Sequence, residues 1–188
     1  MKELSLNILD VAENSVKAEA KNVEIKLEET ENTLRLSIVD DGKGMKPDFL
    51  ARVTDPFVTT RTTRSVGMGL SLLKLAAEQT GGDMTIESVS QELSPEKHGT
   101  CVTAFFHTDH IDFEPLGDVI STMMTLIQGS PDIDFVFEHT YPAGETALDT
   151  KEMRAVLGED VKLDNAEVIA WIGQFLKEQY AESGYYTN

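Results

Sequence analysis

Three polar residues near the N-terminus, Asp10, Asn14 and Lys17, follow one another at spacings of four and three. In an α-helix these spacings place the three side chains on one face. A solvated helix face would explain a carboxylate, an amide and an amine in one row, and the rest of the chain decides whether that explanation holds. Apolar residues at helical spacing over residues 4–18 predict that helix.

The stretch VDDGKGM places Asp40 at the end of an expected strand, with Gly42 and Gly44 directly after it. A carboxylate at this position can accept a hydrogen bond at the floor of a pocket, and the glycines let backbone approach a flat ring. A surface turn is built from the same residue types, so the stretch alone leaves both interpretations open.

The stretch RSVGMGLSLL places Gly67 and Gly69 at the start of another expected helix. The first amides of a helix lack internal partners and favour phosphate oxygens. Arg61 and Arg64 precede them and add positive charge, unless they belong to a solvated basic loop. Further on, Thr100 begins a strand, where its hydroxyl could bond the Asp40 carboxylate or a ring nitrogen.

The elements that must position these groups follow from apolar periodicity and turn residues. Up to residue 110 we expect a helix at 4–18, strands at 22–29 and 33–40, helices at 47–53 and 70–80, and strands at 84–90 and 100–107. Residues 54–69 are expected to form a loop. This order predicts an α+β fold with mixed or antiparallel pairing and helices on one face of the sheet.

The rest of the chain is less regular. We expect helices at 115–128, 150–158 and 165–182 and a strand at 132–139. The helical stripes around Met123 and around Trp171 and Phe175 predict core packing, and a partner groove is the alternative for Met123, Met124 and Leu126. Residues 111–188 carry 15 acidic and four basic side chains, a net charge of −11, against −6 for residues 1–110. We therefore predict a first domain over 1–110 and an acidic α/β extension of unknown role over 111–188.

Composition narrows the classes of partner. The net charge of −17 argues against a nucleic-acid or anionic membrane surface. No apolar run reaches the roughly 20 residues of a membrane span, and the N-terminus lacks the layout of a signal peptide. Cys101 is the single cysteine, which leaves no internal disulfide and suits the cytoplasm.

The order of these motifs resembles that of the GHKL ATPase superfamily, which includes histidine kinases, DNA gyrase B, heat-shock chaperones and mismatch-repair ATPases. The resemblance covers roughly residues 4–107. The stretch DPFVTTRTTRSVGMGLSLLKLAAEQTGG is especially similar to the lid and following helix of histidine kinases, whereas DVAENSVKAEAKNVEI is more similar to mismatch-repair ATPases. It implies a Bergerat-type two-layer α/β sandwich with a mixed sheet that binds Mg-ATP. A P-loop is excluded because G-K-[ST] is lacking, and a Rossmann site because no G-x-G-x-x-G follows a parallel βαβ unit.

The resemblance also implies roles by position. Asn14 would be the magnesium ligand, Lys17 would contact phosphate, and Asp40 would accept from the adenine amine with support from Thr100. The residues implied to bind nucleotide are Asn14, Lys17, Asp40, Gly42, Gly44, Met45, Thr59, Thr60, Arg61, Gly67, Met68, Gly69, Leu70 and Thr100. The polar row of the N-terminal helix would then form the magnesium and phosphate edge of the pocket.

Two departures affect the expected activity. Where ATP-hydrolysing members have a glutamate base, this chain has the shorter Asp10, with Glu13 as the second candidate. The expected helix starts at residue 4, which leaves no room upstream for a phosphoacceptor helix, and none of the four histidines is followed by an acid. We expect a kinase module acting on a separate protein; an ATP-hydrolysing conformational switch and a non-catalytic adenine-nucleotide sensor are the alternatives.

The chain is also similar to short stand-alone ATP-binding proteins encoded near iron-hydrogenase subunits. That similarity implies a redox-enzyme subunit as the partner protein, and the kinase interpretation implies a signalling receiver. A homodimer is compatible with either.

Overall fold

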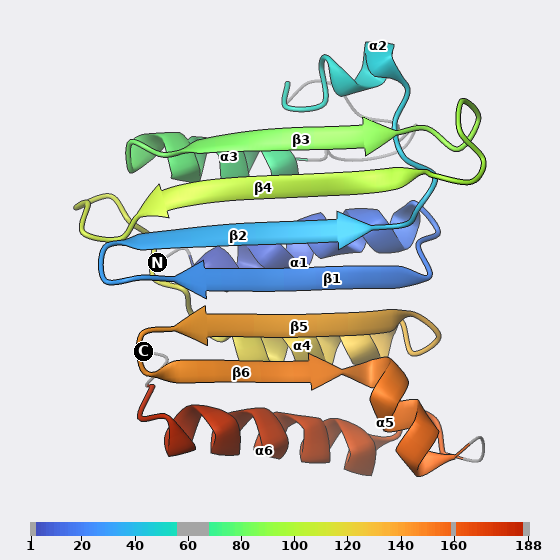
Figure 1. Ribbon diagram of the computed structural model, residues 1–188, viewed down its shortest axis with the longest axis vertical. Helices are drawn as coiled ribbons and strands as arrows, with labels where there is room; N and C mark the ends of the chain where they lie inside the picture. The colour runs from blue at the N-terminus through green and yellow to red at the C-terminus, as the bar shows by residue number, and fades with distance from the viewer. Residues whose placement is uncertain (1–2, 56–67, 159–160, 186–188) are drawn as a thin grey trace.

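The computed structural model describes residues 3–55, 68–158 and 161–185 and contains one six-stranded mixed sheet (Figure 1). Its strands are β1 (Asn22–Glu29), β2 (Thr33–Asp40), β3 (Asp83–Val89), β4 (Gly99–His107), β5 (Asp134–Tyr141) and β6 (Gly144–Asp149). They lie in the order β3-β4-β2-β1-β5-β6. Every pair is antiparallel except β1 with β5, which is parallel. The predicted α+β class and mixed sheet are confirmed.

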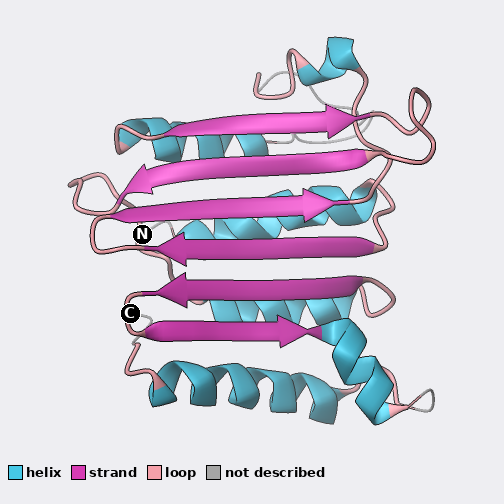
Figure 2. Cartoon of the chain, in the orientation of Figure 1, coloured by secondary structure: helices cyan, strands magenta, loops and turns pink. Residues whose placement is uncertain are grey.

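Six described helices accompany this sheet. They are α1 (Leu4–Lys17), α2 (Pro47–Leu50), α3 (Gly69–Gln79), α4 (Val119–Gly129), α5 (Thr150–Leu157) and α6 (Ala166–Glu182). Helices α1, α3 and α4 cover the rear face of the sheet in the view of Figure 1. Helix α1 packs between α3 and α4 behind the sheet, and α6 lies along β6 and contacts α4 (Figure 2). None of the described helices is long and apolar enough to cross a bilayer. The arrangement is the predicted two-layer sandwich.

The core forms where the alternating strands meet the apolar face of α1. In β1, Val23, Ile25 and Leu27 are buried, while Lys26 between them points to the other face of the sheet and stays partly exposed. Ile8 of α1 is fully buried against this layer. Because such side chains are close-packed, truncating one leucine of this layer to alanine would cost about 2–5 kcal/mol of stability.

Residues beyond 110 continue the same sheet and the same core. Phe135 and Phe137 of β5 are buried next to β1, and Met123 of α4 is fully buried, as its helical stripe predicted. Thr122 also donates from Oγ1 to the Ser5 carbonyl at 3.1 Å, which ties α4 to α1. The sheet and the core both run across residue 110. The division into two domains at this residue stays a prediction.

A buried polar cluster joins the end of β1 to the C-terminal segments. His139 is fully buried, with Nδ1 2.8 Å from the Tyr180 hydroxyl and Nε2 3.2 Å from Glu29 Oε2, and Tyr185 donates to the same oxygen at 2.7 Å. Burial works to raise the pKa of Glu29, but the hydrogen bonds from His139 and Tyr185 outweigh it and hold that pKa below its ordinary value. The ionised carboxylate therefore stabilises the fold.

This cluster predicts an acid-sensitive contribution to stability. A folded-state pKa below the unfolded value stabilises above the unfolded pKa, and the contribution is lost as pH falls through the folded pKa. We expect Glu29→Gln to lower the melting temperature by about 2–4 °C at pH 7, and the deficit to shrink as pH falls to about 3. Thermal melts across this range test it, with Glu28→Gln, which loses only an exposed pair to Arg35, as the control. A deficit that is constant with pH would contradict this role for Glu29.

Candidate nucleotide site

The carboxylate of Asp40 is held between α1 and the turn that follows β2. The hydroxyl of Ser15, which is 4% exposed, donates to Asp40 Oδ2 at 2.6 Å, and the Gly42 amide donates to Oδ1 at 2.9 Å. An ionised carboxylate offers about four lone-pair sites, so two donors leave capacity for a third. Asp40 is therefore fixed in orientation and still able to accept a bond from a ligand amine.

The glycines of the turn are required by close approach of the chain to itself. A Cβ on Gly42 would lie 2.8 Å from Ala18 Cβ, and one on Gly44 would lie 1.9 Å from the Val89 carbonyl oxygen. Gly44 also has a φ of +63°, which favours glycine. The D-x-G-x-G stretch thus packs against the end of α1 and the end of β3. This packing supplies a structural reason for both glycines in addition to the predicted room for a ring.

Thr100 lies opposite Asp40 in the register of β2 and β4, but its hydroxyl has another partner. Thr100 Oγ1 is 2.8 Å from Ser88 Oγ, which also accepts from the Met45 amide at 2.8 Å and donates to the Gly99 carbonyl at 3.0 Å. Thr100 and Ser88 therefore anchor Met45 after the turn. The support predicted from Thr100 for Asp40 comes from Ser15, a residue that the sequence analysis missed.

Asp41 fixes the same turn from the side of β1. It accepts from the Lys21 amide at 2.7 Å, the Asn22 amide at 2.9 Å and the Asn22 side chain at 2.7 Å. Burial works to raise the pKa of Asp41, but these hydrogen bonds outweigh it and lower the pKa. His98 Nδ1 lies 2.6 Å from the Gly42 carbonyl, and because a carbonyl only accepts, Nδ1 is the donor.

The polar row of α1 lies on the outer side of the helix, next to Ser15. Asn14 is half-buried, while Asp10 and Lys17 are exposed. Lys17 Nζ pairs with Glu13 Oε2 at 2.8 Å, with both side chains 48% exposed. A surface pair of this kind contributes only about 0–1 kcal/mol, so a phosphate can compete for the lysine. Glu13, the second candidate base, thus serves as the partner of Lys17.

Helix α3 begins directly beside Asp10. A Cβ on Gly69 would lie 3.1 Å from Asp10 Cβ, so the glycine allows α1 and α3 to touch here. Met68 is exposed as the residue before α3, and Leu70 is buried. The first amides of α3, which have no partner within their own helix, and the Asp10 side chain therefore share one corner. Among the other predicted residues, Thr59, Thr60, Arg61 and Gly67 lie outside the described part of the chain.

The geometry predicts a measurable role for Ser15. We expect Ser15→Ala to weaken ATP binding by about tenfold, because a hydrogen bond to a charged group contributes about 1.5–3 kcal/mol and here orients Asp40. Isothermal titration calorimetry measures the affinity. Ser5→Ala is the matched control, since Ser5 is another buried serine of α1. Equal losses in both variants would mean that α1 is merely destabilised.

Comparison with known protein families shows to which family the chain with this site belongs. The profile of the family described as histidine kinase-, DNA gyrase B- and HSP90-like ATPase matches residues 2–110, more than half of the chain. The chain belongs to this ATPase family. The predicted superfamily and Bergerat-type fold are confirmed, and the chain contains an ATP-binding module of the histidine-kinase-like type.

Relatives of this ATPase-family chain include sensor kinases. An NtrY-like sensor histidine kinase of Rickettsia felis is 26% identical over 91 residues, 48% of this chain and 15% of that protein. Sensor histidine kinase RegB of Cereibacter sphaeroides is 25% identical over 124 residues, 58% of this chain and 27% of that protein. The chain thus matches less than a third of the length of these kinases.

A solved structure supports the fold over a longer range. The N-terminal domain of a DNA repair protein covers 85% of this chain, and the match spans 58% of that chain. The TM-score is 0.51 at 16% sequence identity. This similarity concerns the fold alone.

Proposed function

We propose that this ATPase-family protein binds Mg-ATP at the corner of α1, α3 and the turn after β2, and acts as a regulatory or signalling kinase module on a separate protein. The observation that carries the proposal is the carboxylate of Asp40, oriented by Ser15 and Gly42 with acceptor capacity left. In this proposal the Asp40 carboxylate accepts a hydrogen bond from the adenine amine. Lys17 exchanges its ion pair with Glu13 for one with the phosphates. The first amides of α3, which have no partner within their own helix, would face the phosphates.

The residues present fit a magnesium ion that arrives with ATP. Magnesium prefers oxygen ligands, keeps several waters and binds through one or two protein groups plus phosphates. Within residues 3–55, 68–158 and 161–185 no cluster of three or more His, Cys, Asp and Glu is arranged for a metal. The half-buried amide of Asn14 on the inner side of the polar row is the group proposed to hold the ion. Bound magnesium would neutralise phosphate charge.

A second candidate function is an ATP-hydrolysing conformational switch. The contact of Asp10 with Gly69 favours it, because this carboxylate stands beside the helix start proposed for the phosphates. Asp10 could then orient a water molecule there. A kinase acting on another protein needs the same site but delivers the phosphoryl group to an acceptor side chain of the partner. That partner is proposed to be a signalling receiver or a redox-enzyme subunit, and the proposed location is the cytoplasm.

The fate of the γ-phosphate separates these functions. The full chain is incubated with magnesium and γ-labelled ATP, and free phosphate, labelled protein and bound ATP are followed together. For the kinase module we expect saturable ATP binding with little free phosphate and no labelled chain. Free phosphate at a catalytic rate, lost about 100-fold in Asp10→Asn but retained in Glu13→Gln, would establish the switch instead. Absence of ATP binding would overturn both.

A further inference from the structure

A groove far from the nucleotide corner lies between α5, α6 and the open face of β5 and β6. Its volume is about 740 Å³. Val136 and Ala147 of the strands form the floor, Val156 of α5 forms one side, and Trp171 and Phe175 of α6 form the other. Figure 1 shows this end of the sheet opposite to α3 and β3.

The groove leaves large apolar side chains in water. Val156 is 86% exposed and Trp171 is 54% exposed, and Leu157 and Val161 beside them are also exposed. Trp171 stacks on Phe175 with ring centroids 5.0 Å apart and planes 11° apart, so the α6 wall is flat and aromatic. The helical stripe predicted core packing for Trp171, and this prediction is wrong. Clustered exposed apolar groups of this kind mark interaction sites.

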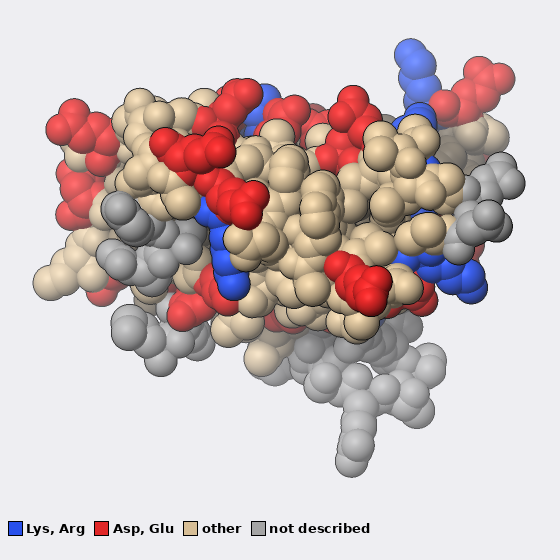
Figure 3. Space-filling view, turned by 90° about the horizontal axis from the view of Figure 1, so that it is seen from below, with Lys and Arg blue, Asp and Glu red and all other residues tan. Residues whose placement is uncertain are grey.

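The rim of the groove is acidic. Among the described residues that line it, four are acidic and none is basic: Glu138, Asp149, Glu152 and Glu167. In the view from below onto α6, acidic side chains surround a central uncharged area and basic ones are few (Figure 3). Residues 111–188 as a whole have a net charge of −11. The surface is therefore complementary to a cationic occupant.

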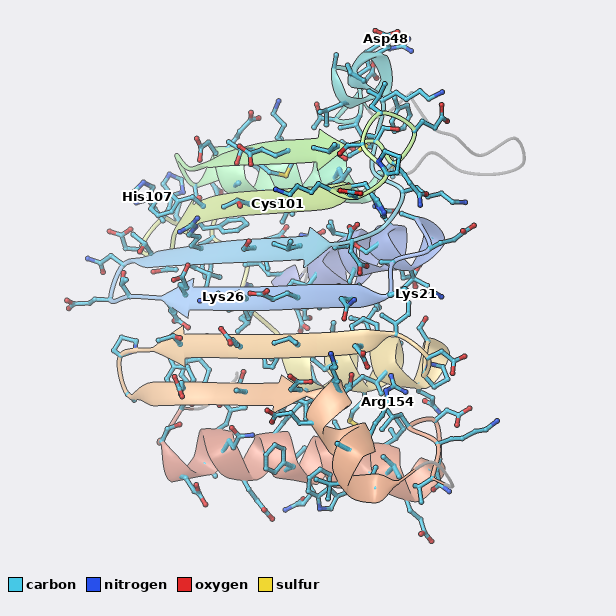
Figure 4. The ribbon with its side chains drawn as sticks, turned by 45° about the vertical axis from the view of Figure 1, so that its right-hand side comes forward. Lys21, Lys26, Asp48, Cys101, His107 and Arg154 are labelled. Atoms are coloured by element: carbon cyan, nitrogen blue, oxygen red, sulfur yellow. The ribbon has the colours of Figure 1, made fainter. Side chains whose placement is uncertain are left out.

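Arg154 of α5 does not neutralise this rim. Arg154 reaches back to the start of β5 (Figure 4), where Nε donates to Asp134 Oδ1 at 3.0 Å and Nη2 donates to the Ile133 carbonyl at 2.7 Å. Its Nη1 donates to the Pro131 carbonyl. These contacts hold α5 in place against β5, so one wall of the groove is firmly positioned. Of the rim carboxylates, Glu138 pairs with Lys26 Nζ at 3.4 Å, and Asp149 accepts from the first amides of α5. Within the described part of the chain Glu152 and Glu167 have no ion pair, so these two carboxylates are the ones that a cationic occupant would meet.

Charge also decides between possible occupants. A second copy of this chain, with a net charge of −17, would bring two acidic rims together. An anionic lipid surface would be repelled for the same reason. An uncharged small molecule would fill the apolar floor without using Glu152 and Glu167 on the rim. A cationic side chain next to Trp171 would gain from both the carboxylates and the aromatic face.

We propose that this groove binds a short amphipathic helix of a partner protein, with apolar side chains against Trp171 and Val156 and Lys or Arg residues against the acidic rim. Helices laid into grooves are read through anchors at helical spacing, and the groove offers apolar contacts from two helices and two strands. The inference rests on the proposed function only in that a partner exists. The inference specifies which kind of segment the partner presents, and binding in the groove does not depend on ATP binding at the corner of α1 and α3.

The test uses the full chain and a phage-displayed library of random 16-residue peptides. We expect the enriched peptides to be cationic, with apolar residues at i, i+3 or i+4, and i+7. Trp171 is the only tryptophan, so its fluorescence reports directly on the groove. Titration of an enriched synthetic peptide should shift the emission to shorter wavelength and saturate, as the indole loses contact with water.

Two matched variants locate the binding. Val156→Lys should weaken peptide binding about tenfold or more, whereas Ile111→Lys, which changes charge equally at a 95% exposed residue outside the groove, should not. No enrichment, enrichment of neutral or acidic peptides, or equal binding by both variants would overturn the proposal. A dimer of the full chain that Val156→Lys dissociates would assign the groove to a second copy instead. ATP binding, measured in parallel, separates failure of this proposal from failure of the nucleotide site.

Discussion

Replacing Asp40 with asparagine is expected to reduce ATP affinity by at least about 100-fold. The carboxylate already accepts from the Ser15 hydroxyl and from the Gly42 amide, and the adenine amine would be its third donor. Asparagine offers a single acceptor oxygen and turns an NH₂ group toward one of these donors. At least one buried donor then loses its partner, and the charge that strengthens the remaining bonds is gone.

Isothermal titration calorimetry of ATP against the purified variant measures this loss. Asp48→Asn is the control, because Asp48 lies exposed on α2, away from the sheet (Figure 4), and undergoes the same chemical change. The far-ultraviolet circular dichroism of both variants should match the parent chain. An Asp40→Asn protein that is folded and binds ATP with unchanged affinity would remove Asp40 from the pocket.

The second large effect is expected for Asn14→Ala, which should abolish the dependence of ATP binding on magnesium. The parent chain should bind Mg-ATP at least about tenfold more tightly than ATP with a chelator present, and the variant should bind both alike. The reason is that the amide oxygen of Asn14 is the group proposed to link the ion to α1. Metal-free ATP should bind the two proteins equally, because Asp40 and Lys17 are unchanged.

Asn7→Ala is the matched control for this experiment, since Asn7 lies on the same face of α1 two turns earlier. It should leave the magnesium dependence intact. If Asn14→Ala still requires magnesium, the ion is held by another residue. If it loses all ATP binding with or without magnesium, the amide positions the nucleotide itself.

The sequence predicted those elements whose local pattern is strong. The bounds of β1 and β2 agree with the expected 22–29 and 33–40, because the alternation of apolar and polar residues is strict there. Strand β6 was missed. Its fully buried residue at position 146 is a threonine, whose hydroxyl is 2.9 Å from that of Tyr141, so the apolar alternation is interrupted. Such a strand is recognised only when its partner β5 is present.

The site was predicted in its residue types but not in its hydrogen bonds. Helical spacing identifies the polar face of α1, yet nothing local indicates that Ser15, on a neighbouring face, reaches a carboxylate 25 residues later. The partner of Thr100 likewise depends on the position of Ser88 across the sheet. Trp171 was placed in the core because its spacing fits an apolar stripe, whereas the stripe faces an unfilled groove. Long-range contacts decide each case.

The parallel pairing of β5 with β1 has a consequence for truncated forms of the protein. A fragment ending near residue 110 would expose β1 as an edge strand, with a row of unpaired amides and carbonyls over Asn22–Glu29. Its apolar Val23, Ile25 and Leu27 would also lose the neighbouring Phe135 and Phe137. Open edges of this kind template aggregation, so we expect residues 111–188 to keep residues 1–110 soluble by covering this edge.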